Sequence, residues 1–424
     1  MPMNRRQLLH AALSAPLALP GLGAALGPSR AWASSGDLRF VFVLAPGGWD
    51  TTRAFTPQFG NDLVDMEPLA QPGQVGDVPF VDHPERPAVR AFFEAHASQT
   101  LLINGILVPS VAHRSCMRLL WTGSTADGQA DWPAWIAADS TDWTIPHLVL
   151  DGPSFPGPHG GAVVRTGSGG QLAGMLNGSL QARMEPRPSA APDAVQALIQ
   201  GRVDDRVAAA EAAARTTRDR ALVSDYAQAL ERAKGLVGAG DALPWDTGGT
   251  FEGQVDLAVA ALERDLCRSC SLTFADERQW DSHYLNDERQ GPLFQGLFEG
   301  LNLLMARLAG TTSSDGGAPL AERTVVVVLS EMGRTPLKNA SKGKDHWPTT
   351  SALLVGPGVT GGRVVGELDE VSTGLPLDPL SGEVDSAGGV EVTGAHLGAT
   401  LMALAGADPA EALPGVEPLY GLLA

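Results

Sequence analysis

Lysine is scarce in this chain of 424 residues, and the scarcity bears on which partners the sequence favours. Only Lys234, Lys338, Lys342 and Lys344 occur, and 48 acidic residues outnumber 30 basic ones. Proteins that bind nucleic acid need a surplus of Lys and Arg for the phosphate backbone, so this composition excludes nucleic acid as an expected partner. Three of the lysines lie within residues 338–344, a clustering that needs its own explanation.

Cysteine is also rare, with only Cys116, Cys267 and Cys270. So few cysteines exclude a small domain held together by many disulfides. Cys267 and Cys270 form a C-x-x-C pair, but no second pair and no histidine lies at the spacing of a zinc ribbon. The pair can be a disulfide, a redox-active dithiol or two buried thiols, and we favour buried thiols or a bridge over redox chemistry.

Long apolar runs are missing after residue 33, so we expect that the mature form does not span a membrane. Residues 1–33 contain Arg5-Arg6, an Ala/Leu-rich stretch at 8–26 and no acidic residue, and they end in Ala31-Trp32-Ala33. This order predicts a cleaved twin-arginine signal peptide, with an uncleaved anchor as the alternative. We therefore expect the twin-arginine export machinery as a partner and a periplasmic or extracellular location. Cleavage would leave 27 basic and 48 acidic residues, a net charge of −21.

Apolar runs alternate with amphipathic segments along residues 34–424. Runs of β-branched and aromatic residues predict buried strands at 39–45, 101–106, 324–329 and 352–355. Helical spacing predicts helices at 88–97 and 293–308, the second opened by Gly291-Pro292. The alternation predicts a single α/β domain over residues 34–424, with a mostly parallel sheet flanked by helices.

An inserted helical hairpin is predicted within this domain. Residues 192–237 are rich in Ala, with Arg, Glu and Asp interspersed at helical spacing. We place the whole insertion at about 190–268, where it could cover a site. Residues 152–180 are rich in Gly, Pro and Ser, which predicts long surface loops.

Carboxylates and imidazoles follow several of the predicted elements. In open α/β sheets, ligands bind beyond the carboxyl ends of the strands, so these residues are candidates for a site. Oxygen and nitrogen donors without thiolate suit a divalent ion such as Zn²⁺, Mn²⁺, Ca²⁺ or Mg²⁺. The alternatives without a metal ion are helix capping by Asp50 or Asp281 and pairing of Glu331 with Arg334. The candidate metal ligands are Asp50, Asp281, His283, Glu331, Asp345 and His346.

The late strand and the residues after it resemble a bacterial family of unknown function. Residues 325–335 (VVVVLSEMGRT) and Lys344-Asp345-His346 are similar to the S-E-F-G-R-T and D-H pattern of the family numbered fifteen hundred and one among domains of unknown function. Trp280–His283 (WDSH) resembles its W-D-T-H, and Gly47–Asp50 (GGWD) its early G-G-x-D. The resemblance implies an alkaline phosphatase/sulfatase-like fold, an export signal and metal ligands at several of the candidate positions.

The sequence departs from active members of that superfamily at two positions. Phosphatases and sulfatases hold a Ser, Thr or modified Cys nucleophile about ten residues before a T-G pair, where this chain has His113 before Thr122-Gly123. Glu331-Met332 stands where superfamily enzymes read D-H. The resemblance therefore implies one metal ion or none, and it puts a full two-metal site in doubt.

Two functions are consistent with these residues. In the first, the protein is an exported metal-dependent hydrolase of phosphate or sulfate esters. Thr51 or His113 would then be catalytic. An anionic small molecule or envelope polymer would be held by four cations, Arg334, Lys338, Lys342 and Lys344. In the second, the protein is a catalytically silent envelope-binding protein with a degenerate site.

Overall fold

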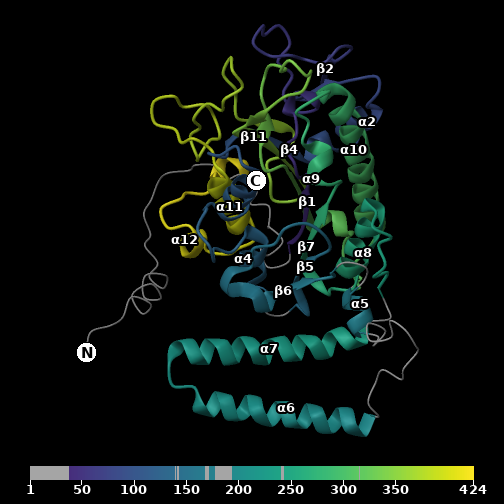
Figure 1. Cartoon of the computed structure of the whole chain (residues 1–424), viewed down its shortest axis with the longest axis vertical. Helices are drawn as coiled ribbons and strands as arrows, with labels where there is room; N and C mark the ends of the chain where they lie inside the picture. The colour runs from purple at the N-terminus through teal and green to yellow at the C-terminus, as the bar shows by residue number, and fades with distance from the viewer. Residues whose placement is uncertain are drawn as a thin grey trace, which may run out of the picture. The chain divides into compact units, whose positions relative to one another are not determined.

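A sheet of eight strands organises the described part of the chain (Figure 1). The computed structural model describes residues 38–138, 140, 143–167, 171–176, 193–239, 243–314 and 316–424. The predicted signal peptide, residues 1–33, lies outside the described residues. In spatial order the strands are β12 (Arg363–Val365), β4 (Thr100–Leu107), β11 (Thr349–Val355), β8 (Thr324–Leu329), β1 (Arg39–Leu44), β7 (Cys267–Thr273), β5 (Ile145–Val149) and β6 (Val163–Arg165).

The sheet is mostly parallel, as the sequence predicts. Only β11 runs against its neighbours, being antiparallel to both β4 and β8, whereas every other neighbouring pair is parallel. Strands β4, β8, β1 and β7 consequently run in one direction, and their carboxyl ends share one edge. The α/β fold class is confirmed.

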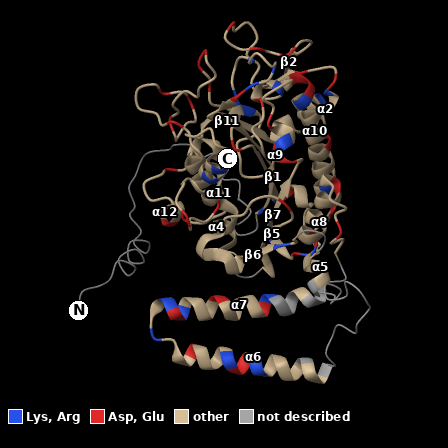
Figure 2. Ribbon diagram, viewed as in Figure 1, with Lys and Arg blue, Asp and Glu red and all other residues tan. Residues whose placement is uncertain are grey.

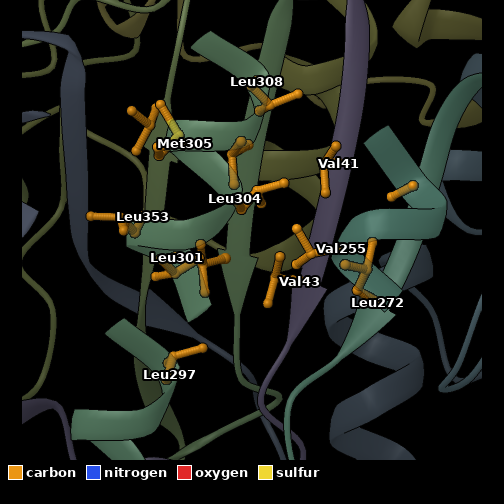
Figure 3. Close-up of a cluster of buried hydrophobic side chains, with 14 of the residues drawn as sticks. Val41, Val43, Val255, Leu272, Leu297, Leu301, Leu304, Met305, Leu308 and Leu353 are labelled. Atoms are coloured by element: carbon orange, nitrogen blue, oxygen red, sulfur yellow. The ribbon is translucent and has the colours of Figure 1, made fainter. Parts of the chain in front are cut away.

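Helices cover both faces of the sheet, which is why the central strands are apolar throughout (Figure 1). The side chains of β1 alternate: Val41 and Val43 pack with α2 (Pro87–His96), α8 (Phe251–Glu263) and α10 (Asn286–Gly310). Figure 3 shows Leu297, Leu301, Leu304, Met305 and Leu308 of α10 in this cluster. Phe40 and Phe42 point to the other face and pack with α3 (His113–Thr122), α4 (Trp132–Ala138) and α11 (Gly394–Leu404).

The predicted helical hairpin corresponds to α6 (Asp193–Ala213) and α7 (Thr217–Ala239), which lie side by side (Figure 1). Nearly all of the described residues of α6 are exposed, and both helices carry charges of both signs (Figure 2). Helix α8 falls within the range predicted for the insertion, but it packs its apolar face onto the sheet. No helix among the described residues is long and apolar enough to cross a bilayer.

Three features differ from the sequence-based expectation. Helix α10 begins at Asn286 rather than at Pro292, because its buried face from Phe294 to Leu308 outweighs the one backbone N–H that Pro292 removes. Strand β7 was not predicted, because only Cys267, Cys270 and Leu272 in it are apolar. The 152–180 stretch also contains β6 and two short helices.

The remaining elements are short. They are η2 (Thr51–Arg53), β2 (Gln71–Val75), β3 (Val78–Asp82), η3 (Ala97–Gln99), η4 (Gly157–Ala162), α5 (Gln171–Leu176), α9 (Glu277–Trp280), η6 (Leu320–Glu322), β9 (Gly333–Arg334), β10 (His346–Trp347), α12 (Pro409–Ala412) and η7 (Tyr420–Leu422).

Candidate functional site

Residues from four segments meet at the carboxyl edge of the sheet. His113 is the first residue of α3, which follows β4, and Glu331 comes two residues after β8. Asp281 caps the end of α9, which follows β7. His346 lies in β10, just before β11, and β11 starts at this edge because it runs antiparallel to β4 and β8. The topology thus brings together side chains that are far apart in sequence.

Three histidine rings are each fixed through one nitrogen. The partners of Nδ1 are Glu331 for His113 (2.7 Å), Asp345 for His283 (2.8 Å) and the backbone oxygen of Val111 for His346 (2.6 Å). Ionised carboxylate and carbonyl oxygens only accept, so each Nδ1 carries the proton and donates it. In the neutral rings the Nε2 atoms therefore keep their lone pairs.

These Nε2 atoms converge on one carboxylate. Asp281 Oδ1 lies 3.1 Å from His346 Nε2, 3.2 Å from His283 Nε2 and 3.6 Å from His113 Nε2. The Nε2 atoms of His283 and His346 are themselves 2.9 Å apart. We call His113, Asp281, His283 and His346 the histidine–aspartate group.

The histidine–aspartate group fits a divalent metal ion. Tetrahedral Zn²⁺ with bonds of about 2.0–2.1 Å separates neighbouring ligand atoms by about 3.3 Å. The spacings among Asp281, His283 and His346, 2.9 to 3.2 Å, are close to this value. An oxygen on the opposite ring nitrogen is the usual partner of a metal-binding histidine. His113 Nε2 is shielded from solvent and has no hydrogen-bond partner among the described residues. Ligand atoms of His113, Asp281 and His346 all lie within 4.8 Å of one another.

Charged neighbours shift the pKa values of two members of the group. Burial lowers the pKa of His113, but the hydrogen bond and charge of Glu331 outweigh burial, so the pKa is raised overall. Burial raises the pKa of Asp281, yet the Arg334 guanidinium 2.8 Å away holds it below its usual value. Asp281 is 29% exposed and His283 43%, so the group opens to solvent on one side.

Glu331 is fully buried and held by the turn after β1. The backbone N–H of Gly47 donates to both of its oxygens, at 2.8 and 3.0 Å. Gly47 has a φ of +115°, and a Cβ there would lie 2.2 Å from the backbone oxygen of Glu277. Only glycine therefore lets the backbone approach Glu331 in this way. Glu331 orients the ring of His113 rather than joining the converging atoms.

Asp50 lies in a separate, buried cluster of charges. It caps η2, accepting from the backbone N–H and hydroxyl of Thr52, and its other oxygen faces Arg53, Asn286 and Lys344. Burial alone would raise the pKa of Asp50, but Lys344 and Arg53 hold it well below its usual range. Burial lowers the pKa of Lys344 more than Asp50 raises it. The protein's own donors surround this carboxylate.

The predicted anion-binding cations have different surroundings. Arg334 donates to the backbone oxygens of Gly47 and Gly48 as well as to Asp281, so it braces the turn after β1. Lys338 pairs with Asp287 at 2.6 Å, and Lys344 is buried. Lys342 is exposed.

Thr51, the other predicted catalytic residue, begins η2. Its hydroxyl accepts a 3.0 Å hydrogen bond from Thr56. Nothing in the described structure links it to the histidine–aspartate group.

Sequence reasoning missed several residues that support these clusters. Arg53 pairs with Glu67 and Asp287 as well as with Asp50, and Asn286 reaches Asp50 from the start of α10. The spacing of Asp50 and Arg53 was a local signal for their pairing. For Asn286 there was none, because 236 positions separate it from its partner.

The family of the chain follows from its sequence. Residues 164–383, just over half of the chain, match the family described as "Protein of unknown function (DUF1501)". The chain belongs to this family. The family description assigns no activity, so membership confirms the family and leaves the chemistry, the metal and the export open. A comparison of this DUF1501 protein with curated proteins finds no match.

Several solved structures are distantly similar to this DUF1501 protein. Ps i-CgsB in complex with k-i-k-neocarrahexaose is 9% identical, with a TM-score of 0.40 over 90% of this chain and 75% of that one. A putative sulfatase from Bacteroides thetaiotaomicron is 11% identical, with a TM-score of 0.38 over 89% and 75%. An alkaline phosphatase superfamily protein from Vibrio parahaemolyticus is 6% identical, with a TM-score of 0.37 over 87% and 67%. Since these TM-scores lie below 0.5, none bears on the activity of this chain.

Proposed function

We propose that this protein is a metal-dependent hydrolase of phosphate or sulfate esters that uses one divalent ion. The observation that carries the proposal is the convergence of three histidine Nε2 atoms on Asp281 Oδ1. Asp281, His283 and His346 are the proposed ligands, and His113 Nε2 faces the same point. A divalent ion held there would supply Lewis-acid chemistry, polarising an ester oxygen and lowering the pKa of a bound water.

The surrounding residues have defined tasks in this proposal. Glu331, Asp345 and the Val111 backbone oxygen hold the three rings in the tautomer that presents Nε2. Arg334 offsets the charge of Asp281 and ties it to the turn after β1. The partial exposure of Asp281 and His283 leaves one side of the group open to a substrate.

Two exposed cations on the segments that carry His113 and His283 favour an anionic substrate. Arg114 follows His113 directly, and Lys342 is paired through a backbone bridge with Tyr284, the residue after His283. Both side chains are exposed, in a chain whose net charge is −18. A small anion or an anionic polymer would gain charge-assisted contacts from them. Substituting both with Gln should raise KM for an anionic ester while leaving the metal content unchanged.

The proposal is tested first by measuring metal binding and then by measuring turnover. The purified protein should be stripped with a chelator, titrated with Zn²⁺, Mn²⁺, Ca²⁺ or Mg²⁺, and assayed with para-nitrophenyl phosphate, its diester and para-nitrophenyl sulfate. We expect about one tightly bound ion per chain and metal-dependent hydrolysis of one ester class. His346→Ala should abolish both, whereas His96→Ala, an imidazole on α2 outside the group, should change neither.

Two outcomes would contradict the hydrolase proposal. Absence of any metal binding at micromolar concentrations would remove its basis. Metal binding without turnover of any ester would instead favour the silent binding protein. Export is a separate proposal, tested by fractionating cells and by replacing Arg5 and Arg6 with Lys, which should retain the precursor in the cytoplasm.

A further inference from the structure

We infer that Cys267 and Cys270 form a disulfide bond within strand β7. The two sulfur atoms lie 3.3 Å apart, and both side chains are completely buried. In a regular strand, residues three positions apart point to opposite faces and lie about 10 Å apart, so a contact of this kind is not expected. The inference depends on no part of the proposed function.

A local irregularity in β7 brings the two thiols together. Cys267 and Cys270 both belong to the cluster under α8 and α10. Arg268 and Ser269, between them, both face the other side of the sheet, where Ser269 contacts His147. Two successive residues on one face break the side-chain alternation of the strand, although its pairing with β1 and β5 keeps one register, and this puts the flanking cysteines on the same face.

Arg268 explains why β7 keeps this irregular course. Its guanidinium donates to the backbone oxygens of Leu38 and Ala405 and to the hydroxyl of Ser140, at 3.1, 2.6 and 2.8 Å. Leu38 directly precedes β1, and Ser140 and Ala405 follow α4 and α11, the helices on the other face of the sheet. These contacts hold Arg268 away from the face where the two thiols meet.

Forming the disulfide bond requires an oxidant and only a small movement of the two sulfur atoms. Each thiol loses its hydrogen, the two sulfur atoms join, and two electrons with two protons pass to a small disulfide such as oxidised glutathione, which becomes two thiols. Since neither sulfur is accessible in the folded protein, the bond would form before β7 is covered. It should then resist reductant until the chain unfolds. All three cysteines are unbridged in the structure. Once the bridge forms, Cys116, which is buried in the other cluster, is the remaining free thiol.

Counting thiols tests the inference with an internal control. The full chain is refolded with reduced and oxidised glutathione, dissolved in denaturant, alkylated with and without reductant, and analysed by mass spectrometry. We expect one alkylated cysteine, Cys116, without reductant and three with it. Cys116→Ala should leave none before reduction, and Cys270→Ala should leave two.

Two results would overturn the inference. One is that all three cysteines are alkylated without reductant, and the other is a bridge that involves Cys116 or a second chain. If Cys270→Ala fails to fold, the native sequence alone decides, because the peptide that spans residues 267–270 either carries the bridge or takes up two alkyl groups. Hydrolase activity and metal content play no part in this readout.

Discussion

The Lys344 ammonium lies 3.0 Å from the Asp50 carboxylate, and both side chains are almost completely buried. Asp50 follows β1 at the carboxyl edge of the sheet, where the sequence suggested a metal ligand. Its oxygens instead receive donors from Lys344, Arg53 and Asn286. The backbone of Lys344 also bonds to Ser282, so this ion pair links η2 to the loop that carries His346.

Replacing Lys344 should destabilise the fold. In Lys344→Met the Asp50 carboxylate loses its closest cation in a buried setting, and we expect a loss of about 3 kcal/mol in the free energy of unfolding. Adding Asp50→Asn should recover part of that loss, because the double variant buries one fewer unpaired charge. Urea unfolding measures both changes. Lys342→Met, an exposed neighbour, should change stability by less than about 0.5 kcal/mol, and an equal loss there would contradict the role of the buried pair.

Removing Asp345 should weaken metal binding without removing a proposed ligand. Asp345 holds the His283 ring through Nδ1, and loss of such an outer partner typically lowers metal affinity by about 10–100-fold. We therefore expect Asp345→Ala to lower the metal affinity by about 10–100-fold in a calorimetric titration. His346→Ala should lower it further. Asp50→Asn should leave the affinity of the folded protein unchanged. A loss for Asp50→Asn as large as that for His346→Ala would show that Asp50 is a ligand after all.

The close approach of two loops behind His283 should not tolerate a methyl group. A Cβ on Gly343 would lie 2.0 Å from the backbone carbonyl of His283, so Gly343→Ala must push apart the loops that carry His283 and His346. We expect a loss of about 1–3 kcal/mol in stability together with weaker metal binding. Gly201→Ala is the matched control, because nothing lies near its Cβ, and it should be neutral or stabilising. Unchanged metal affinity in Gly343→Ala would refute the coupling of these loops.

His147 should make stability depend on pH in the acidic range. Burial lowers the pKa of His147 to about 3, and its ring contacts the hydroxyls of Ser269 and Ser271. The unfolded chain takes up a proton near pH 6.5 while the folded chain does not, so stability is complete above that pH and is lost as the pH falls toward about 3. Between about pH 7 and about pH 5 we expect His147 to account for a loss of about 2 kcal/mol.

Urea unfolding of the native protein and of His147→Asn at these two pH values measures the effect. The variant should lose about 2 kcal/mol less than the native protein on acidification, whatever its stability at neutral pH. Identical losses in the two proteins would mean that His147 is protonated in the folded state.

Local sequence predicted the strands and helices whose apolar pattern is unbroken. Strand β8 has the bounds expected from TVVVVL, and the Ala-rich stretch forms α6 and α7. Strand β7 could not be found this way, because its polar residues are satisfied by partners far away in sequence, such as Leu38 and Ala405 for Arg268. Its place beside β1 depends on those long-range contacts.

The sequence by itself determined the α/β class, the family and the residue types at the carboxyl edge, since these follow from periodicity and from motifs within short segments. Only the tertiary structure decided which of those residues meet. His113 joins Asp281 and His346, whereas Asp50 is paired with Lys344. The physical reason is that a carboxylate has no fixed role of its own. The donors that the fold brings within about 3 Å decide whether it caps a helix, pairs with a buried cation or faces a group of imidazoles.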